Sequence, residues 1–432
     1  MIEIMRNPEV LRREIGVLGA IFLGLGSILG TGVFVSIGLV IGQVGEWIGL
    51  ALLFAGILAV CNGLSSAQLA AAYPVSGGTY EYAYRTLHPL AGIFAGWLFL
   101  IAKSASAATA ALGVLSFSAA ALNLVLTDFA LRFGSAALSL LVTCLVLLGL
   151  RRSNQFNVAV VLITILSLVS FVLFGAFVET TGDSNLRDAQ LAPEGVLEAT
   201  ALLFVAYTGY GRIATLGEEV REPRRTIPLA ICGTLGISWL LYASVGWVLT
   251  KYQKLADLGL GVGLNRPLQL EVLVQSFEQP WLEKLIQLGA ITAMLGVLLN
   301  LVLGLSRVYL ALGRRNDLPK AFAKLDAQSN PRRAVLFTGA VVAVLCLMGD
   351  VRMTWSLSAV TVLLYYGITN LAALRLSKQN QLFPKWISVI GLLSCGLLSI
   401  FVERDSWFTA VILVVPAVLF SVVLRSRSNL SN

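Results

Sequence analysis

The sequence has little charge. Asp, Glu, Lys and Arg make up 12% of its 432 residues, whereas 57% are hydrophobic. Soluble domains carry about 25% charged residues, so the composition excludes an ordinary soluble protein and indicates an integral membrane protein. No segment is polar enough to form a separate soluble domain, and we expect residues 1–432 to form one transmembrane domain. Residues 1–15 lack an apolar segment with a cleavage site, which indicates a retained tail and not a signal peptide.

Side chains used in catalysis are also scarce. The single histidine, His88, falls in a short loop, which excludes a His-ligated metal or a Ser-His-Asp site within the membrane. No predicted span contains paired aspartates, so an intramembrane aspartyl protease is excluded too. The five cysteines lie in predicted spans without paired loop spacing and are expected to be small buried residues: Cys61, Cys144, Cys232, Cys346 and Cys395. The sequence predicts no enzyme and no cofactor, which leaves carriers, channels and structural membrane proteins.

Long apolar runs are abundant. Runs of about 18 residues or more are candidate spans, and we predict twelve, at 16–40, 47–72, 91–118, 133–150, 155–177, 195–216, 227–249, 284–308, 334–349, 354–374, 384–401 and 407–424. Of the 31 Lys and Arg residues, 21 fall on the side of the N-terminus and 8 on the other side. The positive-inside rule then predicts cytoplasmic termini, with the chain in the plasma membrane, which in a bacterium is the inner membrane. The basic residues form no continuous stripe, so nucleic acid is not an expected partner.

Glycines interrupt two of these spans. The first span contains GLGSILGTGVF at 24–34, and the sixth contains YTGYGR at 207–212. The two spans are five apart, so they cross the membrane in opposite directions. Paired interruptions in two inverted halves indicate the binding site of a secondary transporter. We therefore expect a first repeat at about 16–177, a second at about 195–374, and two further helices at about 384–424.

The physical reason lies in the backbone. Unwinding a helix in lipid frees N–H and C=O groups that must find polar partners. Half-helix N-termini can hold a carboxylate, and freed carbonyls can hold an ammonium group, so a zwitterionic amino acid fits both. The alternative is that Gly26-x-x-x-Gly30 is only a helix-packing motif. The matching interruption five spans later favours transport.

Four stretches resemble the amino acid–polyamine–organocation transporters. They are GLGSILGTGVF, PVSGGTYEYAY at 74–84, FVAYTGYGRIATLGEEVREPRRTIPLAI at 204–231, and SRVYLALGRRNDLP at 306–319. They follow the family's order over residues 12 to 320. The resemblance implies a LeuT-type fold with a 5+5 inverted repeat, broken first and sixth helices, and alternating-access transport of amino acids or related amines.

The resemblance also implies cargo contacts at both breaks. The carboxylate would meet backbone N–H groups at residues 30–32, and the ammonium would meet carbonyls near Ile28 and at 204–207. Gly209 would leave room, and Tyr207 or Tyr210 could close over the cargo as a gate. The predicted binding residues are Ile28, Gly30, Thr31, Gly32, Phe204, Ala206, Tyr207, Gly209 and Tyr210.

The loop GEEVREPRRTIP would be a cytoplasmic element in such a transporter. Glu218 and Glu219 stand beside Arg221, which suggests an ion-pair latch. The alternative is a solvated charged loop.

Three departures from the family pattern bear on coupling and cargo. Proton-coupled relatives place a lysine in the fifth span about seven residues after an asparagine, whereas here Thr164 stands at that spacing from Asn157. Cationic amino acid carriers have an aspartate after the sixth-span aromatic, whereas Gly211 follows Tyr210 here. Sodium-dependent members use eighth-span hydroxyl groups, and residues 295–297 have none. Sodium coupling is therefore disfavoured, and Thr164 is a coupling candidate.

Lys103 lies about a dozen residues into the third span. A buried ammonium is costly in a bilayer and marks a functional candidate. Because burial disfavours a charged amine, Lys103 is a candidate proton carrier. The alternatives are a side chain that extends to the membrane surface or one paired with a backbone carbonyl.

The predicted function is secondary active transport of amino acids by proton symport or exchange. No carboxylate lies at mid-depth to balance an extra cation, which favours a neutral, small or apolar cargo over arginine or a polyamine. A polyamine or cationic amino acid carrier of the same fold and a non-transporting receptor or scaffold are the alternatives. Beyond the cargo and the lipid bilayer, the sequence identifies no protein partner.

Overall fold

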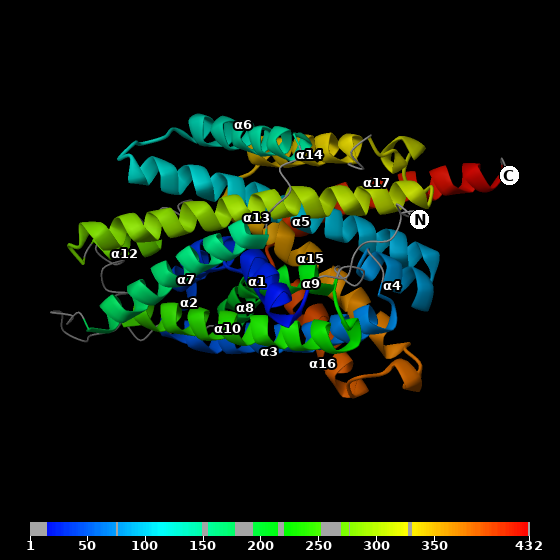
Figure 1. The fold of residues 1–432 in the computed structure, drawn as a ribbon, viewed down its shortest axis with the longest axis horizontal. Coiled ribbons are helices and arrows are strands. Elements are labelled where there is room, and N and C mark those ends of the chain that lie inside the picture. Colours follow the sequence, from blue (N-terminus) through cyan, green and yellow to red (C-terminus); the bar gives the residue numbers. More distant parts are fainter. Residues whose placement is uncertain are drawn as a thin grey trace, which may run out of the picture.

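A bundle of long helices makes up the fold (Figure 1). The computed structural model describes residues 15–74, 77–148, 154–177, 193–214, 220–251, 269–275, 277–326 and 331–430. The first half comprises α1 (Val17–Ile28), α2 (Ile37–Val44), α3 (Ile48–Ala72), α4 (Thr79–Thr86), α5 (Pro89–Ala121), α6 (Asp128–Leu147) and α7 (Asn154–Phe177). The rest comprises α8 (Pro193–Tyr207), α9 (Gly211–Ala214), α10 (Pro223–Lys251), α12 (Gln269–Gln275), α13 (Pro280–Arg314), α14 (Arg332–Met348), α15 (Val351–Leu374), α16 (Lys385–Ile400) and α17 (Arg404–Leu430).

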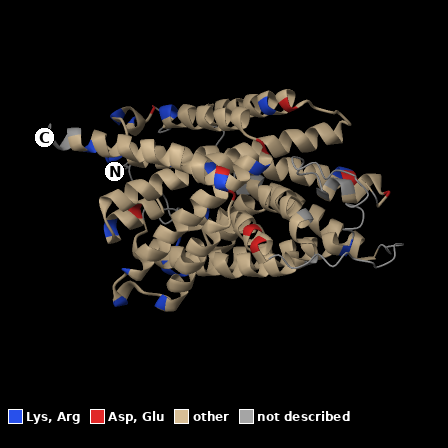
Figure 2. Ribbon diagram, turned by 180° about the vertical axis from the view of Figure 1, so that it is seen from behind, with Lys and Arg blue, Asp and Glu red and all other residues tan. Residues whose placement is uncertain are grey.

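The predicted all-helical membrane fold is confirmed. Within the described ranges, nine helices are long and apolar enough to cross a membrane, and α16 is a shorter apolar helix. Figure 2 shows mostly uncharged residues along the helices, with the few charged residues spread over the ends and the middle of the view. In Figure 1, α4 lies at one end and α12 at the other. The number of twelve spans stays a prediction.

The cysteine prediction holds in part. Cys61, Cys346 and Cys395 are buried, whereas Cys144 and Cys232 are exposed on the outside of the bundle, so burial was the wrong expectation for these two. All five are free. Hydropathy cannot separate a lipid-facing position from a core-facing one, because both are apolar.

The first predicted interruption is an extended break. Helix α1 ends at Ile28, and Leu29 adopts an extended conformation with ψ 101°. The chain becomes helical again at Thr31, passes through a π-helical turn at Gly32–Ser36 and continues as α2. The N–H groups in the first turn of this second half have no partner inside the helix, as the transporter interpretation requires.

The glycines of this stretch serve two purposes. Gly24 and Gly26 lie within α1 and make room for neighbours, since a Cβ on Gly24 would stand 2.7 Å from Thr234 Oγ1 and one on Gly26 would collide with Asn157. A Cβ on Gly30 would stand 2.7 Å from Val297 of α13. The segment therefore contains both glycines that allow close helix packing and a break in the helix.

The second interruption is milder. Helix α8 ends at Tyr207, a 3₁₀ turn spans Thr208–Tyr210, and α9 continues from Gly211. The two interruptions lie against each other, because a Cβ on Gly209 would stand 2.4 Å from the Ser27 carbonyl oxygen. Only glycine permits this approach of the two backbones. The chain thus brings its two weakest helical segments together in the middle of the bundle.

Candidate functional site

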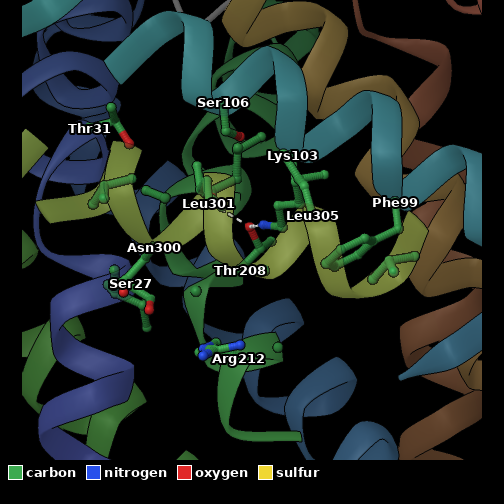
Figure 3. Close-up of a pocket in the computed structure, with 18 of the residues that line it drawn as sticks. Ser27, Thr31, Phe99, Lys103, Ser106, Thr208, Arg212, Asn300, Leu301 and Leu305 are labelled. Atoms are coloured by element: carbon green, nitrogen blue, oxygen red, sulfur yellow. Dashed lines mark hydrogen bonds between the residues drawn. The ribbon is translucent and has the colours of Figure 1, made fainter. Parts of the chain in front are cut away.

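A cavity with both apolar and polar side chains in its walls lies beside the two breaks (Figure 3). Its walls come from α1, α5, α8, α9, α13 and α15. The lining residues are Ser27, Ile28, Thr31, Gly77, Phe99, Lys103, Ser106, Val205, Ala206, Thr208, Gly209, Gly211, Arg212, Val297, Asn300, Leu301, Gly304, Leu305, Arg307, Val308 and Trp355. On α5 these are early residues, and on α13 they are late ones, with Gly77 just before α4. The cavity therefore extends from the breaks toward the end of the bundle that holds α4.

A tyrosine from α10 joins the two breaks. The Tyr242 hydroxyl lies 2.9 Å from the Ile28 carbonyl oxygen and 3.4 Å from that of Ala206. Tyr242 is fully buried. The hydroxyl has one proton to donate, and the shorter contact is the stronger hydrogen bond. Tyr242 thus donates a hydrogen bond to a carbonyl that the break in α1 leaves without a helical partner. The bilayer core could not supply this bond, because it contains no water.

Lys103 reaches the second break. Its Nζ donates to Thr208 Oγ1 at 2.8 Å, and Thr208 Oγ1 in turn donates to the Val205 carbonyl at 2.7 Å. Figure 3 shows the Lys103 and Thr208 side chains pointing toward one another beside Leu305. Lys103 is 8% exposed. The alternative in which Lys103 extends to the membrane surface is therefore not the arrangement in the structure.

Other polar side chains support the cavity walls. Asn300 of α13 is 3.5 Å from the Gly26 carbonyl, so it contacts the last turns of α1. Ser106 of α5 pairs with Ser358 of α15 at 2.8 Å. The Trp355 indole donates to the Leu202 carbonyl of α8 at 3.0 Å. These contacts hold α5, α13 and α15 around the broken segments.

Two arginines line the part of the cavity nearest α4. Arg212 comes from α9, and Arg307 comes from the last third of α13. Gly304 leaves space on α13, since a Cβ there would come within 4.0 Å of the Arg212 guanidinium. Arg212 therefore faces the cavity and α13.

The predicted cargo residues divide into two groups. Ile28, Thr31, Ala206, Gly209 and Lys103 line the cavity. The remaining ones have other surroundings: Gly30 packs on α13, Gly32 on Tyr242 and Ala206, Phe204 on Tyr366, Tyr207 on Tyr242, and Tyr210 on Tyr366. Thr164 is buried in α7 and donates to the Val160 carbonyl of its own helix.

Of the three predicted latch residues, the structure describes Arg221. Glu218 and Glu219 lie outside the described residues. The backbone N–H of Arg221 donates to the Ile15 carbonyl at 2.9 Å, and its side chain is exposed.

Ion pairs that the sequence analysis missed lie near α4. Glu81 accepts from Arg315 at 2.8 and 2.6 Å and also pairs with Arg85 at 3.2 Å, so α4 is fastened to the end of α13. The Tyr80 hydroxyl donates to the buried Asp317 carboxylate at 2.6 Å. Burial, together with the neighbouring Asp317 charge, raises the pKa of Tyr80, so its hydroxyl keeps its proton.

A second ion-pair cluster lies at the opposite end. Arg352, at the start of α15, pairs with Glu403 at 2.5 Å and with Glu198 of α8 at 3.4 Å. The cluster joins α15 to α8 and to the segment before α17.

In the parts of the chain that the structure describes, no group of three His, Cys, Asp or Glu side chains could hold a metal.

Sequence reasoning missed residues that line the cavity or hydrogen-bond to the breaks. Tyr242, Asn300 and Trp355 come from spans that carry no glycine interruption. Their only available signal was a polar or aromatic side chain inside an apolar run, which many positions share.

An apolar helical bundle with a cavity at two touching helix breaks has the architecture expected of a transporter. Comparison with known families agrees: the amino acid permease family model matches residues 19–430. The chain belongs to the amino acid permease family. It is a multi-pass membrane protein of a family of amino acid transporters, and the predicted family resemblance is confirmed.

Curated relatives carry transporter names. An uncharacterized transporter of Mycobacterium tuberculosis is 36% identical over 91% of this chain and 87% of its own length. A branched-chain amino acid permease of Bacillus subtilis is 26% identical, over 78% of this chain and 75% of its own. A methylthioribose transporter of the same organism is 27% identical over the same shares.

Proposed function

We propose that this protein is a secondary active transporter that moves amino acids by alternating access. The observation that carries the proposal is the contact between the two broken segments beside a cavity. The cavity reaches the end of the bundle that holds α4, which the charge bias predicts to be cytoplasmic. This arrangement corresponds to an inward-facing state of a transporter in the plasma membrane, or in the inner membrane of a bacterium.

The cargo would bind through its backbone groups. Its carboxylate would meet the free N–H groups at the start of the second half-helix, around residues 30–32. Its ammonium would compete with Tyr242 for the Ile28 and Ala206 carbonyls. This assignment makes Tyr242 a stabiliser of the empty cavity.

We propose a neutral amino acid as the general cargo. Apolar side chains line much of the cavity, among them Phe99, Val205, Val297, Leu301 and Leu305. Among the described lining residues none is acidic, so an arginine or polyamine cargo would bring a cation without a counter-charge. The name of the Bacillus subtilis branched-chain amino acid permease supports a neutral, apolar cargo.

The same family has a relative named for a different kind of cargo. Methylthioribose is a neutral thio-sugar without an α-amino acid group. Such a cargo could use the apolar walls but not the carboxylate and ammonium positions at the breaks, and the geometry of the two breaks favours an amino acid.

Proton symport or exchange is the proposed mode, with Lys103 as the proton site. Lys103 is the buried amine among the described lining residues, and it is bonded to the second break through Thr208. Thr164 remains the second coupling candidate, acting through the packing of α7 on α1. Loss of the Lys103 proton would remove the charge from its hydrogen bond to Thr208, and the weaker bond would allow the 3₁₀ turn to rearrange.

Uptake into proteoliposomes tests the proposal. A panel of labelled amino acids is measured with and without imposed pH and sodium gradients. We expect uptake of neutral amino acids that responds to the pH gradient and ignores the sodium gradient. Absence of both binding and flux for every amino acid would refute amino acid transport.

A further inference from the structure

The charged groups of the cavity all have the same sign. They are Lys103 on α5, Arg212 on α9 and Arg307 on α13, and the described lining contains no Asp or Glu. Arg212 and Arg307 have further interactions of their own, so the argument rests on Lys103 alone.

Lys103 has more N–H donors than hydrogen bonds to described residues. An ammonium group has three N–H donors, and its hydrogen bond in the described part of the chain is the one to Thr208 Oγ1. Thr208 cannot act as a counter-charge, because its hydroxyl is neutral; its own proton goes to the Val205 carbonyl. No carboxylate of the described residues forms an ion pair with Lys103. The remaining N–H donors therefore serve whatever fills the cavity.

The surroundings make a counter-charge valuable. Phe99, Leu301 and Leu305 line the cavity around the Lys103 side chain, and the nearby Ser106 hydroxyl is already paired with Ser358. A charge in such a poorly hydrated site gains more from an opposite charge than it would in water. A carboxylate is the group that satisfies both the charge and the donors of an ammonium.

The position of this ammonium relative to the breaks decides which part of the cargo meets it. In the proposed function the cargo ammonium sits at carbonyls 204–207, and Thr208 follows them directly in the chain. Because the α-carboxylate is assigned to the N–H groups at 30–32, the side chain is the part of the cargo left to face Thr208 and Lys103. We propose that Lys103 and Thr208 form an anion subsite that lets the same cavity accept amino acids with a side-chain carboxylate, such as glutamate, besides neutral ones. This inference rests on the proposed function and narrows its substrate class.

The inference gives Lys103 a second role beside the proton release proposed above, and this role depends on the cargo. An acidic cargo binds while Lys103 keeps its proton, since the carboxylate replaces water as the partner of the ammonium. A neutral cargo of the same shape makes no such ion pair. Glutamate and glutamine differ in this one group, so their comparison isolates the subsite.

The test measures competition in proteoliposomes. Unlabelled L-glutamate and L-glutamine compete with uptake of whichever labelled neutral amino acid is best transported, and labelled glutamate uptake is measured directly. For the wild type we expect competition by glutamate and saturable glutamate uptake. In Lys103→Met the inhibitory constant of glutamate should rise by about 30-fold or more, the effect of removing one partner of a buried charge pair. The inhibitory constant of glutamine should rise less, by about 2- to 13-fold, because glutamine loses one ordinary hydrogen bond of about 0.5–1.5 kcal/mol and no ion pair.

Two further variants separate charge from packing. Lys103→Arg keeps the charge and should retain most of the preference for glutamate. Lys251→Met removes a lysine from the exposed end of α10, outside the cavity, and should leave both inhibitory constants at the wild-type values.

The outcomes distinguish the two proposals. Transport of neutral amino acids without any competition by glutamate overturns the anion subsite and leaves the proposed function intact. An equal rise in the inhibitory constants of glutamate and glutamine in Lys103→Met also overturns the anion subsite, since the lysine would then affect the binding of both in the same way. Absence of transport for every amino acid refutes the proposed function itself. The wild-type competition decides the question even if Lys103→Met fails to fold.

Discussion

Removing the hydroxyl of Tyr242 should tighten cargo binding. Tyr242 is fully buried, and its hydroxyl lies 2.9 Å from the Ile28 carbonyl oxygen and 3.4 Å from that of Ala206. These are two of the carbonyls at which we place the cargo ammonium. In the wild type the cargo must therefore displace a hydrogen bond that already exists. Tyr242→Phe removes this competitor and leaves the ring contact with Tyr207.

The expected magnitude follows from the cost of an unsatisfied carbonyl. A buried acceptor without a donor costs about 1–3 kcal/mol. The empty Tyr242→Phe protein bears this cost, whereas in the loaded protein the ammonium supplies the missing donor. The thermal stability of the empty variant should fall by this amount, and the cargo affinity should rise by about 5- to 150-fold. Transport should slow at saturating cargo, because tighter binding retards release.

Equilibrium binding and thermal unfolding in detergent, each with and without cargo, measure both effects. Tyr309→Phe is a matched control, since Tyr309 is a buried α13 tyrosine that packs on Trp97 and Phe337, whereas Tyr242 contacts the carbonyls of the two breaks. It should leave the affinity unchanged. Weaker cargo binding in Tyr242→Phe would contradict the reasoning, because the hydroxyl would then contact the cargo and not compete with it.

Three further substitutions probe the contacts between elements. Gly209→Ala places a Cβ against the Ser27 carbonyl. We expect the variant to be expressed at the wild-type level but to lose uptake, with a free energy of unfolding lower by about 1–3 kcal/mol. Uptake at the wild-type rate would show that the two breaks need not touch. Arg352→Gln removes the ion pairs that join α15 to α8 and to the segment before α17. Because these groups are partly exposed, the free energy of unfolding in detergent should fall by about 1 kcal/mol. An unchanged unfolding midpoint would contradict this stabilising role. Asp317→Ala leaves the Tyr80 hydroxyl without its buried acceptor, so the unfolding free energy should fall by about 1–3 kcal/mol and Asp317→Asn should restore part of it; equal midpoints for all three proteins would contradict this role.

The sequence predicts the breaks because the signal for them is local. Glycines at 24–32 and 209–211 are poor helix formers wherever the rest of the chain lies, and both interruptions occur in those stretches. The difference between them could not be predicted. Leu29 becomes extended, whereas Thr208–Tyr210 tightens into a 3₁₀ turn, because each conformation depends on the helices packed around it.

The walls of the cavity depend on long-range packing, which composition and spacing do not reveal. Tyr242 lies 214 residues from Ile28 along the chain, and nothing near either residue in the sequence indicates their contact. Lys103 was identifiable because a lysine deep in an apolar span is costly, but its partner Thr208 was not. Tyr207 and Tyr210 were expected as gates, and the structure places their rings on Tyr242 and Tyr366, so that role stays a prediction.

Blocking the two ends of the cargo in turn tests the central claim, that the paired breaks bind the amino acid backbone. The measurement is counterflow of the best-transported labelled amino acid in proteoliposomes, against the unlabelled parent, its methyl ester and its N-acetyl derivative. Each derivative removes one charge that we assign to one break, so both should compete at least about 100-fold more weakly than the parent, as expected when a buried charged group loses its partner. If either derivative competes as well as the parent, or if a neutral sugar does, the breaks do not hold the carboxylate and the ammonium as we propose.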